Sequence, residues 1–194
     1  MSDIVDSTVS DQRRTWLWDQ QHALVCRIEL SAIYHRKRER FLSHSQKFLQ
    51  ALTALTATFA FSELAKPVGI GPWAALVAAI GSVMPLVFGF SERARDHAQL
   101  AIEYRRLLAE VRKLGARLTE TQLTEMNGRF ASLEVTERAS LGALVVDIQN
   151  EMAIAAGHSD RVVRLTWYQR TFMHFIDFHI QVKSQRSDEP GAAA

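Results

Sequence analysis

Cysteine is nearly absent from the sequence, since Cys26 is the single cysteine among 194 residues. One thiol excludes an intramolecular disulfide framework and fits a reducing compartment. The first eleven residues have neither a basic start nor an apolar core, so we expect no cleavable signal peptide. The net charge of +2 is too small to indicate a nucleic-acid-binding protein, and we expect no direct contact with nucleic acid.

Glycine and proline are missing from the first 66 residues and then cluster in the segment PVGIGP, residues 67–72. Because these residues interrupt regular structure, the cluster predicts a tight turn between two apolar helices. No useful stretch alternates apolar and polar residues, as strands would. The sequence therefore predicts an all-α fold with a helical hairpin, whose second helix starts near Trp73 and continues well past the apolar stretch.

Charged side chains are absent from residues 67–91, and the run WAALVAAIGSVMPLVFGF at 73–90 is long enough to span about 27 Å of the ~30 Å hydrocarbon layer. The preceding uncharged run, residues 48–62, is shorter than the usual ~17 to 25 residues and contains several threonines. We expect transmembrane helices at about 48–64 and 73–90. A buried hairpin in a soluble protein is the alternative.

Basic residues flank the hairpin on one side only. Arg36, Lys37, Arg38, Arg40 and Lys47 precede it, Arg93, Arg95, Arg105 and Arg106 follow it, and the turn has only Lys66. The positive-inside rule then places both termini in the cytoplasm. The juxtamembrane basic cluster Arg36, Lys37, Arg38 and Arg40 could attract anionic lipid, form a solvated helix face, or neutralise a nucleotide phosphate.

Small and polar side chains within the hairpin allow two interpretations. In one, the two helices of a single hairpin pack on each other. In the other, copies of the hairpin assemble so that Gln50, Thr53 and Thr56 face a shared, water-holding axis, with Pro85 as a kink point. The candidate pore or helix-packing residues are Gln50, Thr53, Thr56, Ala57, Ala78, Gly81, Pro85 and Gly89.

The second half of the chain has helical periodicity. Residues 100–114 and 141–155 look like bundle partners, Thr119 and Gln122 predict a capping box, and Gly157 suits a helix end. A last helix is predicted over about 160–183. The predicted organisation is a disordered N-terminus (1–15), a single domain (16–186) with a cytosolic helical region from 91 to 186, and a disordered tail (187–194).

Catalytic and metal-binding signatures are sparse. The sequence has no glycine-rich phosphate loop in a strand-to-helix context, no HExxH motif and no paired cysteines. His174, Asp177 and His179 lie close in sequence but are too few for a metal site, and Cys26 lacks a recognisable base, which predicts an inert thiol. We therefore expect no enzyme activity, no metal and no cofactor.

The basic helix YHRKRERF is followed by the threonine-rich first span, the Pro/Gly turn, the second span, HAQLAIEYRRLLAEV and the closing RLTWYQRTFMHFIDF. In this order of elements, from about Trp16 to Val182, the chain resembles the SLATT family of two-transmembrane-helix effector domains. It implies an oligomeric, pore-forming effector in the inner membrane of a bacterium, acting in antiviral conflict after a signal from a nucleotide synthase or sensor partner. A non-conducting membrane anchor that recruits an enzyme is the alternative.

Overall fold

The computed structural model describes residues 2–63, 71–137, 140–178 and 180. Every regular element among them is helical and none is a strand, which confirms the all-α prediction. The chain forms two compact units, residues 1–137 and 138–194. Units of this kind can belong to one domain, so the single domain over 16–186 stays a prediction.

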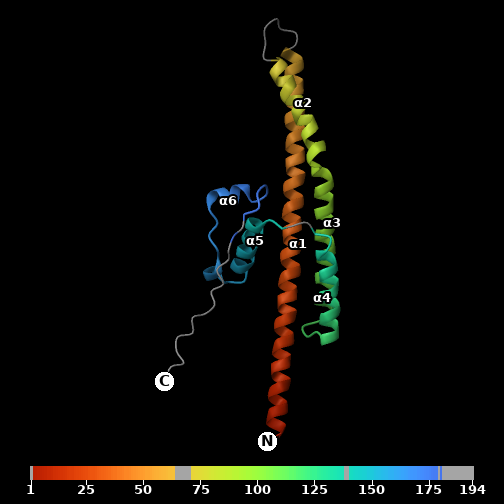
Figure 1. Cartoon of the computed structure of the whole chain (residues 1–194), viewed down its shortest axis with the longest axis vertical. Coiled ribbons are helices and arrows are strands. Elements are labelled where there is room, and N and C mark those ends of the chain that lie inside the picture. Colours follow the sequence, from red (N-terminus) through yellow and green to blue (C-terminus); the bar gives the residue numbers. More distant parts are fainter. Residues whose placement is uncertain (1, 64–70, 138–139, 179, 181–194) are drawn as a thin grey trace. The chain divides into compact units, whose positions relative to one another are not determined.

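Helix α1, Ser2–Glu63, runs the length of the first unit (Figure 1). Its 62 residues correspond to about 93 Å at the usual rise of 1.5 Å per residue. The helix is uninterrupted because neither glycine nor proline occurs before residue 67. It includes residues 2–15, for which the sequence predicts a disordered N-terminus.

Helices α2, Gly71–Phe88, and α3, Phe90–Lys113, run back along α1 (Figure 1). The predicted continuous helix from Trp73 is wrong, since Gly89 separates α2 from α3 with a left-handed backbone (φ 56°, ψ 38°). Glycine adopts this conformation without the steric penalty of a Cβ atom. The carbonyl of Gly89 accepts from the amide of Arg93 at 3.0 Å, so Gly89 begins α3 as its N-cap.

Helix α4, Glu120–Glu134, follows a short loop that starts at Gly115, whose φ of 97° ends α3. The predicted capping box is confirmed. The amide of Gln122 donates to the Thr119 hydroxyl at 3.3 Å, and the amide of Thr119 donates to the Gln122 side chain at 2.9 Å. Two amides that the helix cannot bond internally are thereby satisfied.

The hydrophobic core of the first unit lies where α1, α3 and α4 meet. Tyr104 and Phe130 are its largest members, and Arg27 of α1 lies over the Phe130 ring at 4.4 Å. The same helices are also linked by exposed ion pairs, Arg27–Glu134, Arg112–Glu29 and Arg129–Glu110. Each exposed pair of this kind adds little to the free energy of unfolding. The core residues are Leu24, Ile28, Ala32, Leu100, Tyr104, Leu107, Val111, Leu118, Leu123, Met126 and Phe130.

The hairpin half of this unit exposes its apolar side chains instead of burying them. Of the described α2 side chains, only Ala78 is buried. Among the described residues, no helix combines the length and the apolar character that a membrane crossing requires. Exposed are Phe48, Leu52, Leu55, Phe59 and Phe61 of α1 and Trp73, Leu76, Val77, Ile80, Val83, Val87 and Phe88 of α2.

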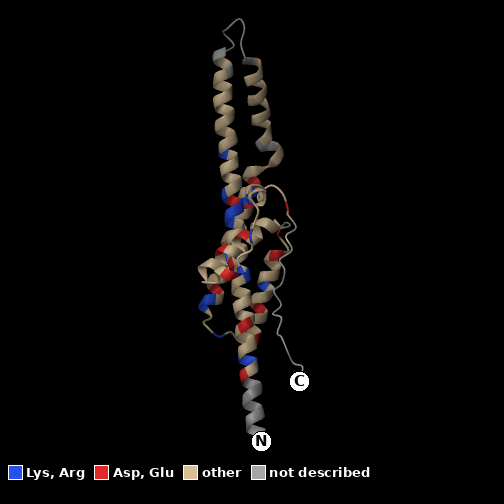
Figure 2. Ribbon diagram, turned by 90° about the vertical axis from the view of Figure 1, so that its left-hand side faces the viewer, with Lys and Arg blue, Asp and Glu red and all other residues tan. Residues whose placement is uncertain are grey.

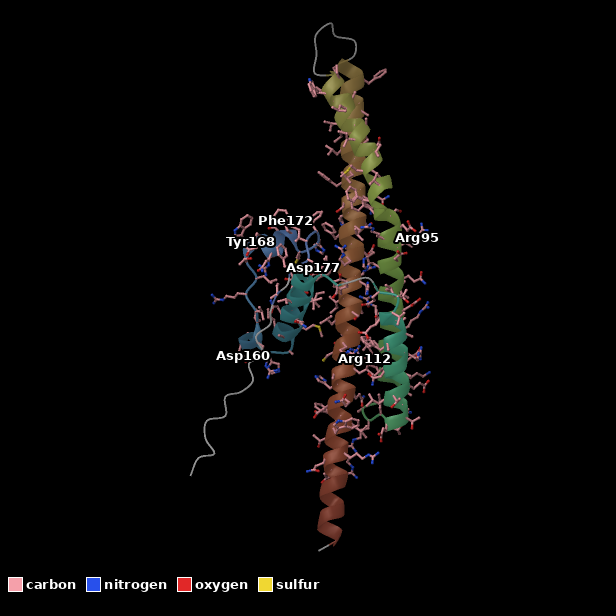
Figure 3. The ribbon with its side chains drawn as sticks, viewed as in Figure 1. Arg95, Arg112, Asp160, Tyr168, Phe172 and Asp177 are labelled. Atoms are coloured by element: carbon pink, nitrogen blue, oxygen red, sulfur yellow. The ribbon has the colours of Figure 1, made fainter. Side chains whose placement is uncertain are left out.

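The second unit contains α5, Gly142–Ala155, a 3-10 turn, Ser159–Arg161, and the short α6, Trp167–Phe172. The end of α5 is as predicted, because Gly157 has φ 82° and the amide of His158 bonds back to Ala153 at 2.8 Å. At its start, Leu141 provides no side-chain cap. The carboxylate of Asp177 takes that role and accepts from the amide of Gly142 at 3.0 Å (Figure 3).

The predicted long helix over 160–183 is wrong. The Asn150 side chain donates to the Val163 carbonyl at 2.7 Å and accepts from the Val163 amide at 2.8 Å. Both backbone groups that a helix would use at this position are therefore taken. A new helix begins only at the capping box of Thr166 with Gln169 and has six residues.

Residues 100–114 and 141–155 fall in different units. The first segment packs with α1 and α4, and the second forms most of α5. The predicted turn residues 67–70, Lys66, His179 and the predicted tail 187–194 lie outside the described residues.

Candidate functional site

The two hairpin helices come into close contact where Thr53 of α1 meets Gly81 of α2. A Cβ atom added to Gly81 would lie 2.6 Å from the Thr53 hydroxyl oxygen, which is closer than real Cβ atoms come. Ala78, one turn earlier on α2, is buried. Thr53, Ala78 and Gly81 thus form a small-residue contact within one hairpin, as in the first interpretation of the sequence.

We expect Gly81→Ala to loosen this contact, because the new methyl group forces Thr53 to rotate or the helices to separate. The matched control is Gly128→Ala in α4, where an added Cβ meets nothing within 4 Å. The control should stabilise the protein by about 0.5–1 kcal/mol through its higher helix propensity. Thermal unfolding followed by circular dichroism should therefore shift the two variants in opposite directions. Equal stabilisation by both would show that α1 and α2 do not approach closely.

The other predicted hairpin residues are not gathered at this contact. Gln50 and Ala57 are exposed on α1, while the hydroxyl of half-buried Thr56 donates to its own helix at the Leu52 carbonyl, 2.6 Å away. Pro85 lies within α2, and its side chain is outside the described residues. Gly89 is the break between α2 and α3.

The juxtamembrane basic cluster divides between solvent and protein. Arg36 and Arg40 are exposed, and Arg36 pairs with Glu39 at 3.3 Å, whereas Lys37 and Arg38 are half-buried. The Arg38 guanidinium lies 5.9 Å from the Phe41 ring centroid. Burial and the nearby positive charge of Arg93 lower the pKa of Arg38 against the opposing effect of Tyr34.

A partly buried polar chain that the sequence did not reveal lies between the helical core and the hairpin. It joins α1, α3 and the residues that follow α4. His35 Nδ1 is 2.7 Å from His97 Nδ1, and His35 Nε2 is 2.8 Å from Glu137 Oε1. His35 is 1% exposed and stacks on Tyr104, with ring centroids 5.7 Å apart. We call Glu137, His35 and His97 the histidine–glutamate chain.

The electrostatics of this chain favour an ionised Glu137. Burial by itself raises the pKa of that carboxyl, but the hydrogen bond from His35, the nearby Tyr104 hydroxyl and the charge of the two histidines outweigh burial and lower it. Burial also raises the pKa of Tyr104 strongly, and the adjacent Glu137 raises it further. Tyr104 thus stays a neutral phenol beside a carboxylate.

Antiparallel hairpin register is the signal that could have located this chain. In such a hairpin, residues equally far from the turn lie side by side on the two helices. Thr53 with Gly81 and His35 with His97 are both such pairs, centred close to residue 66. Glu137 is 102 residues from His35 and has no comparable sequence signal.

The thiol of Cys26 has a neighbour that the sequence interpretation missed. His22 Nε2, one turn earlier on α1, lies 3.6 Å from its sulfur, and His22 stacks on Trp18. Burial and the charge of Glu29 nevertheless raise the pKa of Cys26. A raised pKa lowers the thiolate fraction, which is the opposite of what a nucleophile needs.

One hollow of about 380 Å³ lies between α1 and the loop that joins α3 to α4. Gln21 holds that loop, donating to the Gly115 carbonyl and accepting from the Leu118 amide, each at 3.1 Å. The lining residues are Arg14, Thr15, Leu17, Trp18, Gln21, Ala116, Arg117 and Leu118. The volume would admit a small ligand, although the sequence predicts no cofactor.

No group of three or more metal-ligating side chains occurs within the described parts of the chain. Asp177, which was considered with His174 as a metal ligand from the sequence, serves instead to cap α5.

Comparison with known protein families, with curated proteins and with solved structures finds no match to this chain.

Proposed function

We propose that this protein is a membrane-embedded, oligomerising effector of the SLATT type. Its hairpin, about residues 48–64 and 73–90, would insert into the inner membrane of a bacterium with both termini in the cytoplasm. A nucleotide signal or a partner protein would trigger it to conduct ions or disrupt the bilayer.

The contrast between the two halves of the first unit is the observation that carries this proposal. Residues 48–62 and 71–90 contain no charged side chain, and most of their large apolar side chains are exposed. Figure 2 shows no Lys, Arg, Asp or Glu along residues 48–62 of α1 and 71–88 of α2, whereas these charged residues are frequent on the parts of α1 and α3 that form the core. Contiguous exposed apolar surface of this kind is rare in soluble monomers and marks a surface covered by lipid or protein.

Charge at the base of the hairpin supports the same orientation. Arg36 and Arg40 on α1 and Arg93 and Arg95 on α3 are exposed where the apolar segment ends. Arg95 points away from α1 (Figure 3). Basic side chains at this level attract anionic headgroups by about 1 kcal/mol each.

Conduction would require several copies, because one hairpin cannot enclose a pore. The contact of Thr53 with Gly81 uses one face of α1 within the protomer, whereas Gln50 and Ala57 are exposed. We therefore assign Gln50, rather than Thr53, to a path shared between copies.

A non-conducting anchor is the second candidate. The second unit favours it, because this unit exposes Trp167 and Phe175 (78% and 66% exposed), which are residue types that anchor protein interfaces. Such an anchor would hold a partner enzyme at the inner membrane face.

Carbonate washing of bacterial membranes, followed by reconstitution into vesicles of phosphatidylethanolamine and phosphatidylglycerol loaded with a self-quenched dye, tests the proposal. We expect the protein to stay in the carbonate-washed pellet and, at a protein density high enough for copies to assemble without the trigger, to release the dye. Retention without release favours the anchor. Release of the protein into the carbonate supernatant contradicts both candidates.

A further inference from the structure

The distances within the histidine–glutamate chain determine which of its nitrogen atoms carry a hydrogen. The spacing of 2.8 Å between His35 Nε2 and Glu137 Oε1 is a hydrogen bond in which the imidazole N–H donates to the carboxylate. In neutral His35 the other nitrogen, Nδ1, then carries a lone pair. It accepts from His97 Nδ1–H across 2.7 Å.

One added proton is compatible with this arrangement. It can reside on His97, whose Nδ1–H continues to donate, or on His35, which then donates from Nδ1 to a neutral His97. Either cation lies one or two side chains from the Glu137 carboxylate, which compensates its charge. The bond across 2.7 Å survives because only one of the two Nδ1 atoms carries hydrogen.

A second proton is not compatible with it. With both imidazoles charged, each Nδ1 carries a hydrogen, and two N–H groups and two positive charges would face each other across 2.7 Å. The rings must then separate. A shared metal ion does not explain the spacing either, since nitrogen ligands about 2.0–2.1 Å from a tetrahedral zinc are about 3.3 Å apart.

The surroundings oppose a second charge. Tyr34 of α1 meets His35 and His97 edge-on, and Tyr104 of α3, whose raised pKa keeps its phenol neutral, stacks on His35. Arg38 of α1 adds positive charge near Tyr34, and Arg93 of α3 adds positive charge near Arg38. The acidic groups are Asp96 beside His97 on α3, Glu134 near Tyr104 at the end of α4, and Glu137 itself. Glu134 is engaged by Arg27.

We propose that Glu137, His35 and His97 form a proton-binding site that holds one proton and is broken by a second. Acidification would then release α3 and the end of α4 from α1 just below the hairpin. Gly89, the left-handed break, lies about two turns from His97, so this release would free α2 to move relative to the core. The inference does not depend on conduction or on membrane insertion.

The direction of the pH effect follows from proton linkage. The opened state accepts both protons as the pH falls, whereas the closed state accepts only one. The closed state therefore loses stability on acidification and regains it as the pH rises. The carboxyl of Glu137 does not cause this change, because its lowered pKa keeps it ionised over the range of about pH 8 to 5 in which histidines take up protons.

Hydrogen exchange of the full-length protein between pH 8 and 5, corrected for intrinsic rates, tests the proposal at the amides around His35 and His97. We expect the opening constant to rise by up to about tenfold per pH unit below about pH 6. In His97→Asn the amide side chain can still hydrogen-bond to His35 but takes up no proton, so the opening constant should be nearly flat. The same pH dependence in both proteins would overturn the proposal.

His44→Asn is the matched control. His44 lies on the same helix as His35 but is exposed, with its Nδ1 2.7 Å from the Arg40 carbonyl oxygen, and its substitution should preserve the wild-type pH dependence.

Imidazole ¹⁵N spectra of the unmodified protein at neutral pH provide a second test that requires no folded variant. We expect one protonated and one unprotonated Nδ1 in the His35–His97 pair. Two protonated, or two metal-bound, Nδ1 atoms would refute the site.

Discussion

Ile80→Lys should remove the protein from carbonate-washed membranes. Ile80 lies near the middle of α2 and is 56% exposed, so lysine replaces a side chain that has lipid rather than protein around it under the proposed function. At the centre of a spanning helix this change costs about 3 kcal/mol, which corresponds to about a 100-fold lower ratio of inserted to uninserted protein. Quantitative immunoblotting of pellet and supernatant measures the effect.

Ile102→Lys is the control for this prediction. Ile102 lies on α3, below the hairpin, and is 52% exposed, so the same substitution is made at nearly the same exposure. The Ile102→Lys variant should pellet with membranes to the same extent as the unmodified protein. If the hairpin is instead surrounded by water, both variants should behave alike, and the membrane proposal would be lost.

Phe130→Ala should cause the largest loss of stability. Phe130 is 2% exposed, lies against Tyr104 with ring centroids 5.7 Å apart, and receives the Arg27 guanidinium. Removing a buried phenylalanine costs about 3–5 kcal/mol, through lost apolar burial and the cavity left behind. For a unit of this size we expect the melting temperature to fall by about 10–20 °C, measured from the helical circular dichroism signal.

Phe61→Ala provides the comparison within the same unit. Phe61 is 83% exposed at the end of α1, so its truncation should alter the melting temperature by only a few degrees. A similar loss in both variants would mean that the hairpin, rather than the three-helix core, holds the unit together.

Local signals in the sequence were enough for the elements that depend on neighbouring residues. The cluster of glycine and proline at 67–72 predicted where the first hairpin helix ends, and α1 ends at Glu63, although its start at Ser2 lies within the predicted disordered N-terminus. Thr119 with Gln122 and the glycine at 157 predicted helix ends because capping groups act within a few residues. Charged residues become rare from residue 48 and frequent again after residue 91, and this change in composition predicted a hairpin distinct from the rest of the chain.

Other features depend on partners that the chain brings from a distance. Asn150 takes both backbone groups of Val163 and so prevents the predicted helix over 160–183, yet an isolated asparagine in a sequence indicates nothing of the kind. From the sequence, Gly89 was interpreted as one of the small residues inside the second hairpin helix. Its left-handed conformation is set by the path of the chain, and a glycine permits that conformation without requiring it.

The sequence alone determined that the protein is helical, that residues 48–62 and 67–91 carry no charge, and that nearly all the basic residues near the hairpin lie on one side of it. Composition and local periodicity are sufficient for these properties, because they involve only near neighbours and the solvent. Tertiary structure decided which distant groups come into contact: Thr53 with Gly81, and Glu137 with His35 and His97. Such contacts arise only when helices distant in sequence pack at a particular register. The strength of a hydrogen bond or of a charge interaction then depends on this packing and not on the neighbouring residues in the sequence.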